Sequence, residues 1–175
     1  MKLNIGSRDF EGIYRNDDWL NIDIHPLDKA KRNFQVMDVF HMPLEWADKY
    51  EEVHAIHVLE HVNRNLRQQF VEACYRVTMP GGYCFIEVPD FRETVRLLNL
   101  AFEQQDYRAQ HIWTTSIFGK QRSPGDQHCW GYTSSSLHDL FERAGFKSVE
   151  VTTDSSRMIS SHHKQEPVIL AIGVK

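Results

Sequence analysis

The chain has 175 residues, of which 41% are hydrophobic and 25% charged, with a formal net charge of −4 and a pI near 6.2. This length suits a single domain, residues 1–175, that buries roughly 70% of the surface of its unfolded chain and needs neither metal nor disulfide to hold a core. The acidic balance argues against a general nucleic-acid binder, and no apolar run approaches the roughly 18 residues of a membrane span.

The three cysteines, Cys74, Cys84 and Cys129, show no paired spacing. An odd count argues against a disulfide framework and favours a reducing compartment. The first residues, MKLNIG, hold too short an apolar run for a signal peptide. We therefore expect a cytoplasmic protein that has no membrane segment.

Five strand patterns occupy the first half of the chain, at residues 2–5, 19–24, 34–39, 51–58 and 81–88. The second ends in Asp23 and the third near Asp38. Before the fifth, the run 80–82 (Pro-Gly-Gly) predicts a turn. Only about a dozen residues separate Gly6 from Trp19, near the minimum length of a crossover. The first crossover helix is therefore predicted to be short or missing.

Helical patterns alternate with the later strands. Between the fourth and fifth strands, residues 63–78 carry apolar side chains at spacings of three and four, with Asn63 as the predicted N-cap. Asp90 is the predicted N-cap of the next helix, 90–104, in which Val95, Leu98 and Phe102 share one face.

The last part of the chain alternates again. Residues 117–133 are too polar and too rich in glycine and proline to form an element, so we expect a loop there. A helix at 134–145 ends at Gly145. Strands at 147–152 and 167–175, joined by a short turn, predict an antiparallel edge hairpin. The whole pattern predicts an α/β fold, a mostly parallel sheet with helices on both faces.

In such a sheet the ligand lies outside the carboxyl ends of the strands. Gly6, Ser7, Asp23, Asp38 and His57 stand at those ends. The Asp23 carboxylate suits a ribose, because it can accept hydrogen bonds from both ribose hydroxyls, and Asp23 equally suits a turn. For Asp38 alone, a helix cap or loop residue is the better interpretation.

Two short runs concentrate histidine. In HVLEHV, His57 and His61 are four residues apart, as metal ligands on a helix can be. The run begins in a strand, however, and His61 equally suits a bond to a backbone group at the start of the next helix. In GDQHCWGYT, Asp126, His128 and Cys129 suit a metal site, a general base or a plain loop. We assign no metal to either run.

These motifs, taken in order, resemble the short single-domain class I S-adenosylmethionine-dependent methyltransferases. The matching runs are LNIGS, WLNIDIHP, VMDVFHMPLEWADKYEEVHAIHVLEHV, RVTMPGGYCFIEVPDF and DQHCWGYTSSSLHDLFERAGF. The resemblance implies a Rossmann-like, doubly wound sheet of seven strands with an antiparallel last strand and S-adenosylmethionine as cofactor. It also implies a cofactor site at Gly6, Ser7, Asp23 and Asp38, lined by His57.

Arg8 stands where this family usually has a second glycine. A dinucleotide presents a pyrophosphate that glycine turns let backbone amides reach, whereas S-adenosylmethionine has no phosphate. One glycine is then enough, and Arg8 either pairs with the methionine carboxylate or faces solvent.

The resemblance implies methyl transfer to an unidentified acceptor, which we expect to be a small molecule or a sugar. His61, Asp126 and His128 are the candidate bases. We expect the loop 117–133 to lie over the carboxyl edge of the sheet, with Trp130 as an apolar wall of the acceptor pocket. The alternative is that Trp130 packs into the core and anchors the loop, while Asp126 and His128 only bond the backbone. Three alternatives stay open: a lapsed methyltransferase that acts as a binding or regulatory module, an NAD-dependent oxidoreductase, and a metal hydrolase that uses the histidines. The sequence does not predict an oligomeric state.

Overall fold

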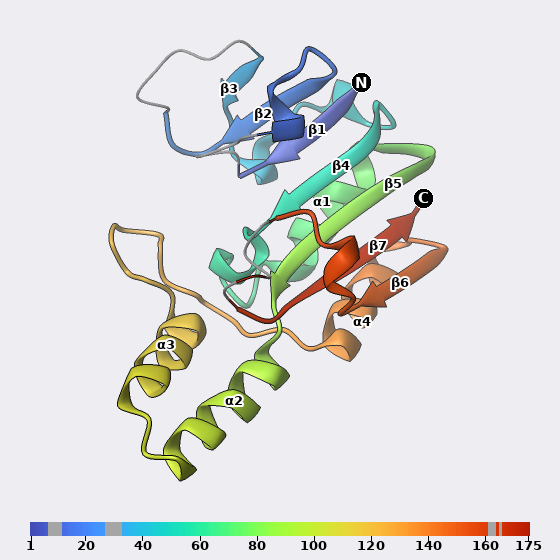
Figure 1. Ribbon diagram of the computed structural model, residues 1–175. Coiled ribbons are helices and arrows are strands. Elements are labelled where there is room, and N and C mark those ends of the chain that lie inside the picture. The colour runs from blue at the N-terminus through green and yellow to red at the C-terminus, as the bar shows by residue number, and fades with distance from the viewer. Residues whose placement is uncertain (7–11, 27–32, 161–163, 165) are drawn as a thin grey trace.

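The computed structural model describes residues 1–6, 12–26, 33–160, 164 and 166–175. This part of the chain holds a seven-stranded sheet in the order β3-β2-β1-β4-β5-β7-β6 (Figure 1). The strands are β1 Lys2–Ile5, β2 Trp19–Asp23, β3 Phe34–Val36, β4 Tyr50–Ile56, β5 Thr78–Pro89, β6 Ser148–Thr152 and β7 Val168–Val174. Strand β7 runs antiparallel to β5 and β6, and the other neighbours are parallel. The predicted Rossmann-like fold with an antiparallel last strand is confirmed.

The described residues form four α-helices, α1 Arg67–Val77, α2 Phe91–Glu103, α3 Tyr107–Phe118 and α4 Ser134–Ala144. Short 3-10 helices join them to the strands: η1 Gly12–Arg15, η2 Val39–His41, η3 Leu44–Trp46, η4 Leu59–His61 and η5 Ser155–Arg157. None of these helices is long and apolar enough to cross a bilayer.

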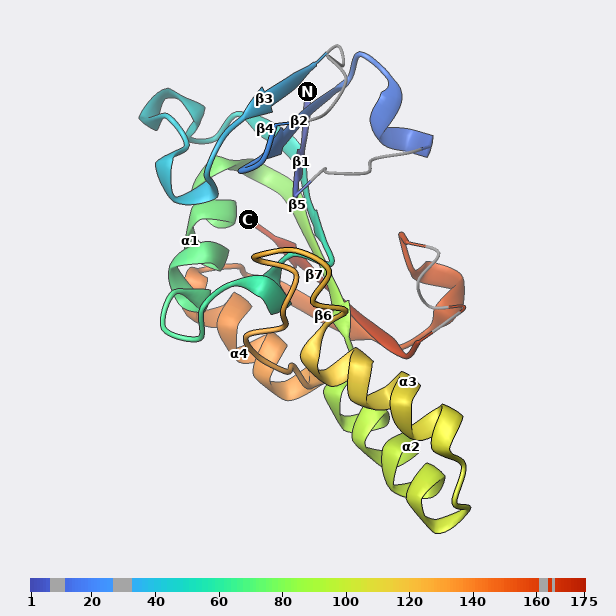
Figure 2. The same cartoon turned by 90° about the vertical axis from the view of Figure 1, so that its left-hand side faces the viewer.

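Helices α1 and α4 pack side by side over one face of the sheet (Figure 2). Four residues of the apolar stripe predicted for α1 are fully buried: Phe70, Val71, Cys74 and Val77. The fifth, Leu66, is 39% exposed, because it precedes the helix. Helix α4 begins in a capping box between Thr133 and Ser136 and ends at Gly145, whose φ is +106°. Burying each large apolar side chain of this layer contributes about 1.5–3 kcal/mol.

The opposite face carries no α-helix within the described residues. In the part of the first crossover that the structure describes, residues 12–18, the one helix is the short η1, in agreement with the predicted short or missing helix. An aromatic cluster covers this part of the sheet instead: the Tyr14 ring meets the Trp19 ring edge-on at 4.8 Å, and Tyr14 Oη shares a 3.0 Å hydrogen bond with His54 Nδ1. The prediction of helices on both faces therefore holds for one face only in this part of the chain.

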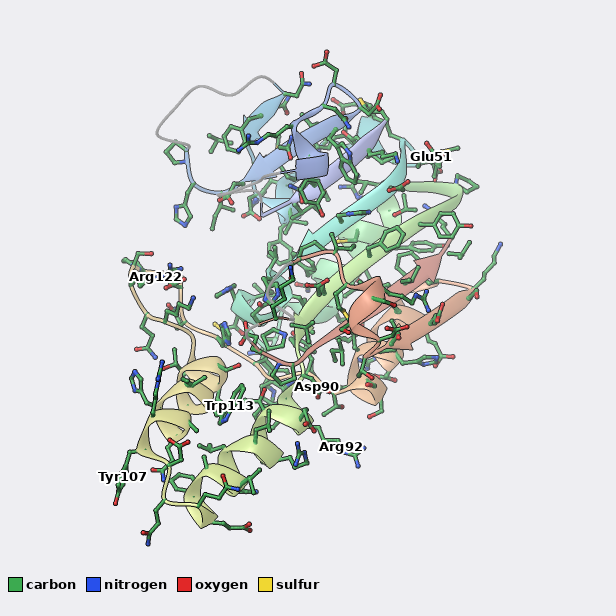
Figure 3. The ribbon with its side chains drawn as sticks, viewed as in Figure 1. Glu51, Asp90, Arg92, Tyr107, Trp113 and Arg122 are labelled. Carbon is green, nitrogen blue, oxygen red and sulfur yellow. The ribbon has the colours of Figure 1, made fainter. Side chains whose placement is uncertain are left out.

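Helices α2 and α3 form a hairpin that projects beyond the edge of the sheet (Figures 1 and 3). Asp90 caps α2 by accepting hydrogen bonds from Arg92 N and Glu93 N, as predicted. The face that Val95, Leu98 and Phe102 share is not the buried one, because Phe102 is 56% exposed, whereas Thr94 and Ala101 are buried. The reason is that α2 packs mainly on α3, a helix that the sequence analysis did not predict.

Several predicted boundaries differ from the structure for local reasons. Helix α1 begins at Arg67, and Asn63 is not its N-cap but closes a turn by accepting from Asn65 N. Strand β3 stops at Val36 because Asp38 caps η2. Strand β5 starts at Thr78, and the predicted turn 80–82 is an irregularity inside it.

Two connections near the end of the chain also differ. The loop predicted at 117–133 begins after Phe118, where α3 ends. Strands β6 and β7 pair antiparallel as predicted, but residues 153–167 join them rather than a short turn.

We expect Gly6→Ala to lower the free energy of unfolding more than Gly81→Ala. Both glycines have a φ of +77°, so both alanines carry a backbone strain of about 1–2 kcal/mol. A Cβ at Gly81 meets nothing within 4 Å, whereas one at Gly6 overlaps Val58 Cγ2, which adds about 1–3 kcal/mol. Urea unfolding of both variants measures the difference. Equal losses would show that Val58 does not require a glycine at position 6.

We also expect His54 to make the free energy of unfolding decrease as the pH falls. Burial lowers the pKa of His54 to about 4, although Glu52 opposes the shift. In the unfolded chain a histidine has a pKa near 6.5, so the unfolded chain binds the proton more tightly than the folded one. The stabilising contribution of neutral His54 is therefore fully present above pH 6.5 and is lost as the pH falls toward 4. It amounts to about 2 kcal/mol between pH 7.5 and 5. His54→Phe should flatten the measured pH dependence by that amount, and an unchanged slope would show that His54 titrates normally.

Candidate functional site

The carboxyl ends of β1 and β2 bring Gly6 and Asp23 to the same edge of the sheet. Gly6 N donates to Ile22 O at 2.9 Å, which ties the residue after β1 to its neighbour strand. Asp23 is 7% exposed, and its Oδ1 accepts from His25 N at 2.8 Å. The turn role that the sequence allowed for Asp23 is thus present. Its buried position at the strand end is also where a ribose-binding carboxylate lies in such folds.

Three other predicted cofactor residues are Asp38, Ser7 and Arg8. Asp38 lies beyond β3, where Oδ1 accepts from Phe40 N at 3.0 Å and Oδ2 lies 3.1 Å from His41 Nδ1. The helix-cap interpretation of Asp38 is confirmed, and its contact with a cofactor stays a prediction. Ser7 and Arg8 lie outside the described residues.

A buried charge network joins the carboxyl ends of β4 and β5. His57 follows β4 in a left-handed conformation, with a φ of +55°. Its Nδ1 lies 3.1 Å from Glu60 Oε1, and its Nε2 lies 3.5 Å from Glu87 Oε1. Glu87 also accepts from Ile159 N at 2.7 Å and from Ser160. The network thereby ties three separate segments together at this edge.

The electrostatics of this network favour charged groups in spite of burial. Burial disfavours a histidinium, but hydrogen bonds to Glu60 and Glu87 outweigh it and raise the pKa of His57 to about 10. Burial likewise opposes both carboxylates, yet their hydrogen bonds to His57 hold the pKa values of Glu60 and Glu87 below the usual range. His57 is thus engaged with carboxylates through both ring nitrogens, and its predicted contact with a cofactor stays a prediction.

Glu60 also gathers two histidines from separate segments. One potential ligand atom from each of Glu60, His61 and His128 lies within 4.8 Å of the other two. The rings of His61 and His128 meet edge-on, with centroids 4.9 Å apart. His61 and His57 therefore do not act as a pair, because His61 turns toward the loop and His57 toward the core. The predicted backbone bond of His61 exists, but to Gln127 O in the loop rather than to the next helix.

The loop after α3 is held against η4 by its backbone. Cys129 N and Trp130 N both donate to Glu60 O, at 2.7 and 3.3 Å. Gly131 allows close contact with Phe91, since a Cβ there would run into the Phe91 ring. The loop therefore lies at the carboxyl edge of the sheet, as its predicted lid position required.

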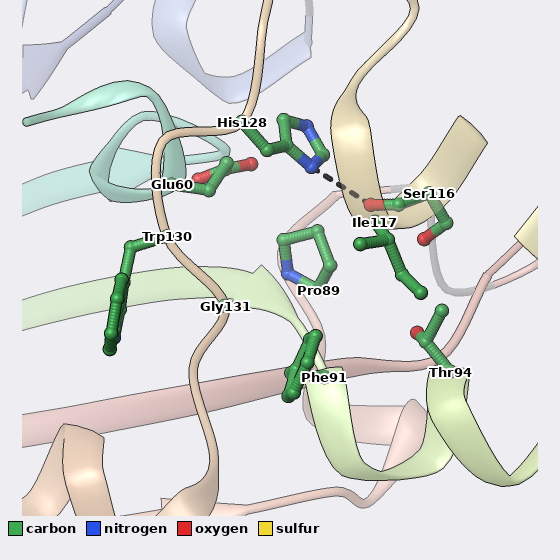
Figure 4. Close-up of a pocket in the computed structure, with 9 residues that line it drawn as sticks. All are labelled: Glu60, Pro89, Phe91, Thr94, Ser116, Ile117, His128, Trp130 and Gly131. Atoms are coloured by element: carbon green, nitrogen blue, oxygen red, sulfur yellow. Dashed lines mark hydrogen bonds between the residues drawn. The ribbon is translucent and has the colours of Figure 1, made fainter. Parts of the chain in front are cut away.

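A small pocket lies beneath this loop, between the end of β5 and the α2–α3 hairpin (Figure 4). Its free volume of about 10 Å³ is roughly that of one ordered water. The lining residues are Glu60, Pro89, Phe91, Thr94, Ser116, Ile117, His128, Trp130 and Gly131. Glu60 and His128 thus bring polar groups from η4 and the loop, Thr94 and Ser116 add hydroxyl-bearing side chains from α2 and α3, and the remaining side chains of the wall are apolar.

The loop residues singled out from the sequence have different surroundings. Trp130 lines the pocket and also packs on the core, with the guanidinium groups of Arg64 and Arg67 4.9 and 5.1 Å from its ring. Asp126 pairs with Arg122 at 3.0 Å, and those hydrogen bonds hold the pKa of Asp126 below its usual range. Asp126 is not among the pocket residues or in the cluster with Glu60 (Figure 3 shows Arg122 at the far end of the loop).

The sequence analysis missed Glu60 and Glu87 as site residues. Glu87 stands inside the apolar run CFIEVP and is fully buried. A lone carboxylate in a strand that is buried on both faces is rarely found without a partner, and this signal pointed to it. Ser160 carried no such signal, because only the fold brings it to Glu87.

Comparisons with known proteins agree on one family. The family model described as "methyltransferase domain" matches residues 11–151. A search of curated proteins gave no match.

Several solved structures share the fold. An S-adenosylmethionine-dependent methyltransferase from Archaeoglobus fulgidus is 14% identical with a TM-score of 0.63, and the match covers 99% of this chain and 85% of that one. One from Thermotoga maritima is 13% identical with a TM-score of 0.59, covering 99% and 81%. The 1,6-didemethyltoxoflavin N1-methyltransferase of Burkholderia thailandensis, with S-adenosylhomocysteine bound, is 10% identical with a TM-score of 0.58, covering 99% and 71%.

We expect Glu87→Gln to cost about 3 kcal/mol of unfolding free energy, because it leaves the buried His57 charge without one of its two carboxylates. Glu150→Gln is the matched control. Glu150 also forms an ion pair from a strand, with Arg157, but both groups are exposed to solvent, so its loss should leave the free energy of unfolding nearly unchanged. Chemical denaturation compares the two. Similar losses would show that the network does not stabilise this edge.

Proposed function

Because the chain belongs to the methyltransferase-domain family, we propose that it binds S-adenosylmethionine and transfers the methyl group to a small acceptor. The observation that carries the proposal is the arrangement at the carboxyl edge of the sheet. Strand order reverses between β1 and β4, and ligands of open α/β sheets bind at such a switch point. Gly6 and Asp23 lie on one side of that point, and the pocket with Glu60 and His128 lies on the other.

The residues at this edge fit the cofactor. The left-handed turn at Gly6 brings the backbone close to the space above β1, and the buried Asp23 carboxylate suits the two hydroxyls of a ribose. No phosphate has to be held, so the lack of an α-helix in the described part of the first crossover is no obstacle. When bound, S-adenosylmethionine supplies a methyl group already activated on a sulfonium. Most of the remaining work is then positioning.

The edge of the sheet around this pocket is the proposed acceptor side; the pocket itself holds about one water, so a bound acceptor requires the loop after α3 to move outward. Phe91 and Trp130 offer apolar walls, while Glu60 and His128 offer polar groups at one end. This mixture supports a small molecule or a sugar rather than a macromolecular surface. A histidine there, His128 or the neighbouring His61, would take up the proton of an acceptor hydroxyl or amine. Asp126 is a weaker candidate base, since its carboxylate is paired with Arg122.

We also propose that residues 1–175 act as one domain in a reducing, cytoplasmic setting. The free thiols of Cys74, Cys84 and Cys129 support the compartment.

A second candidate is a methyltransferase-like binding module without activity. It is favoured by the first crossover, because the four-residue η1 is the one helix in its described part, residues 12–18. Titration calorimetry with S-adenosylmethionine, S-adenosylhomocysteine and NAD separates the candidates. We expect the first two to bind at one site per chain and NAD not to bind. No binding of any of them would favour the inactive module, and binding of NAD alone would favour an oxidoreductase.

We expect Asp23→Asn to weaken S-adenosylmethionine binding by roughly 1–3 kcal/mol, through loss of charge-assisted hydrogen bonds. Asparagine keeps the oxygen that accepts from His25 N, so the turn survives. Asp106→Asn is the matched control, because Asp106 caps α3 through Ala109 N, away from this edge. Calorimetry on both variants measures the effect. Unchanged affinity in Asp23→Asn would make Asp23 a turn residue only.

A further inference from the structure

The cluster of Glu60, His61 and His128 has a carboxylate oxygen with no partner. Glu60 is 1% exposed, and one of its oxygens, Oε1, faces His57. The other, Oε2, is fully buried and has no hydrogen-bond partner in the part of the chain that the structure describes. A buried ionised oxygen without a partner is costly. We therefore expect a ligand from outside the chain to contact Glu60 Oε2.

The hydrogen bonds of His61 and His128 fix which nitrogen of each ring carries the hydrogen. His61 Nδ1 lies 3.0 Å from Gln127 O, and His128 Nδ1 lies 2.8 Å from Ser116 O (Figure 4 shows the second bond). A carbonyl oxygen only accepts, so each Nδ1 carries the hydrogen. In the neutral ring, Nε2 then keeps its lone pair. Metal-bound histidines are held in this way, with the second nitrogen donating to a backbone carbonyl.

Backbone contacts position the three side chains before any ion arrives. Glu60 and His61 share η4, and the loop that carries His128 is bonded to Glu60 O through Cys129 N and Trp130 N. His128 N also donates to Phe118 O at the end of α3. His57 orients the Glu60 carboxylate from the far side, as a carboxylate ligand requires.

We propose that Glu60, His61 and His128 form a binding site for one divalent transition-metal ion, of which Zn²⁺ is the best fit. Two imidazoles and one carboxylate suit zinc, whereas Mg²⁺ and Ca²⁺ prefer oxygen ligands. The three ligand atoms, now within 4.8 Å of one another, need only modest side-chain closure to reach a common ion.

An ion with three protein ligands keeps an open position, as catalytic zinc sites do. Glu60 and His128 also line the pocket, so that position is available to an oxygen or nitrogen atom of the bound acceptor. This role rests on the proposed methyl transfer, although the site itself does not. With the ion bound, the two histidines act through it rather than as free bases.

The test is zinc binding by the purified chain after treatment with a chelator. We expect one tight Zn²⁺ per chain by calorimetry and elemental analysis, and Co²⁺ in its place should give the visible absorption of a tetrahedral site. His61→Ala and His128→Ala should each weaken zinc binding by at least roughly 10- to 100-fold, because that is the cost of losing a group that only supports a metal ligand. Both residues are only partly buried, so these variants avoid the folding risk of Glu60→Gln.

The matched control is His138→Ala, because this exposed histidine of α4 pairs with Glu142 outside the cluster and should leave zinc binding unchanged. Equal affinity in all four proteins, or no stoichiometric zinc in the wild type, would overturn the site. Calorimetry with S-adenosylmethionine on the same samples keeps the two proposals apart. Loss of zinc with intact cofactor binding is expected of His128→Ala, whereas a wild type that binds zinc but no cofactor would contradict only the proposed function.

Discussion

A histidine held between two buried carboxylates is the interaction on which this edge of the sheet depends. Taking charges out of water costs several kcal/mol per ion, and only mutual attraction with good hydrogen bonds offsets that cost. His57 contacts Glu60 and Glu87, and backbone amides near Ser160 complete the shell of Glu87. Because none of these groups is stable there alone, the segments that carry them are held in one arrangement. The position of η4 and of the chain after η5 follows from it.

The rest of the candidate site is built outward from Glu60. Its backbone oxygen holds the loop after α3, and its carboxylate faces the histidine that the loop carries. The pocket is therefore closed by a loop whose anchor is the same residue that lines it. This arrangement couples the acceptor side to the buried network, so a change at Glu60 reaches the loop, the pocket and His57 together.

The two faces of the sheet are stabilised differently. Helices α1 and α4 bury one face with aliphatic and aromatic side chains. On the other, the described residues offer the ring cluster of Tyr14, Trp19 and His54, with a polar group that burial keeps uncharged near neutral pH. A short crossover is thus compatible with a stable sheet, because large aromatic side chains bury much apolar area and pack edge-to-face.

The residue patterns by themselves determined the alternation of strands and helices, the antiparallel pairing of the last two strands and the helices α1, α2 and α4, because periodicity and capping are local properties of neighbouring residues. The doubly wound sheet of seven strands came from the resemblance to a family. It also placed Gly6 and Asp23 at strand ends. It did not predict that α2 packs on α3 rather than on the sheet, since both surfaces suit the same amphipathic pattern. Only the tertiary structure decided the partners of Glu60 and Glu87. Ser160 meets Glu87 across 73 positions and His128 joins Glu60 across a helical hairpin, and no local pattern records such contacts between distant segments.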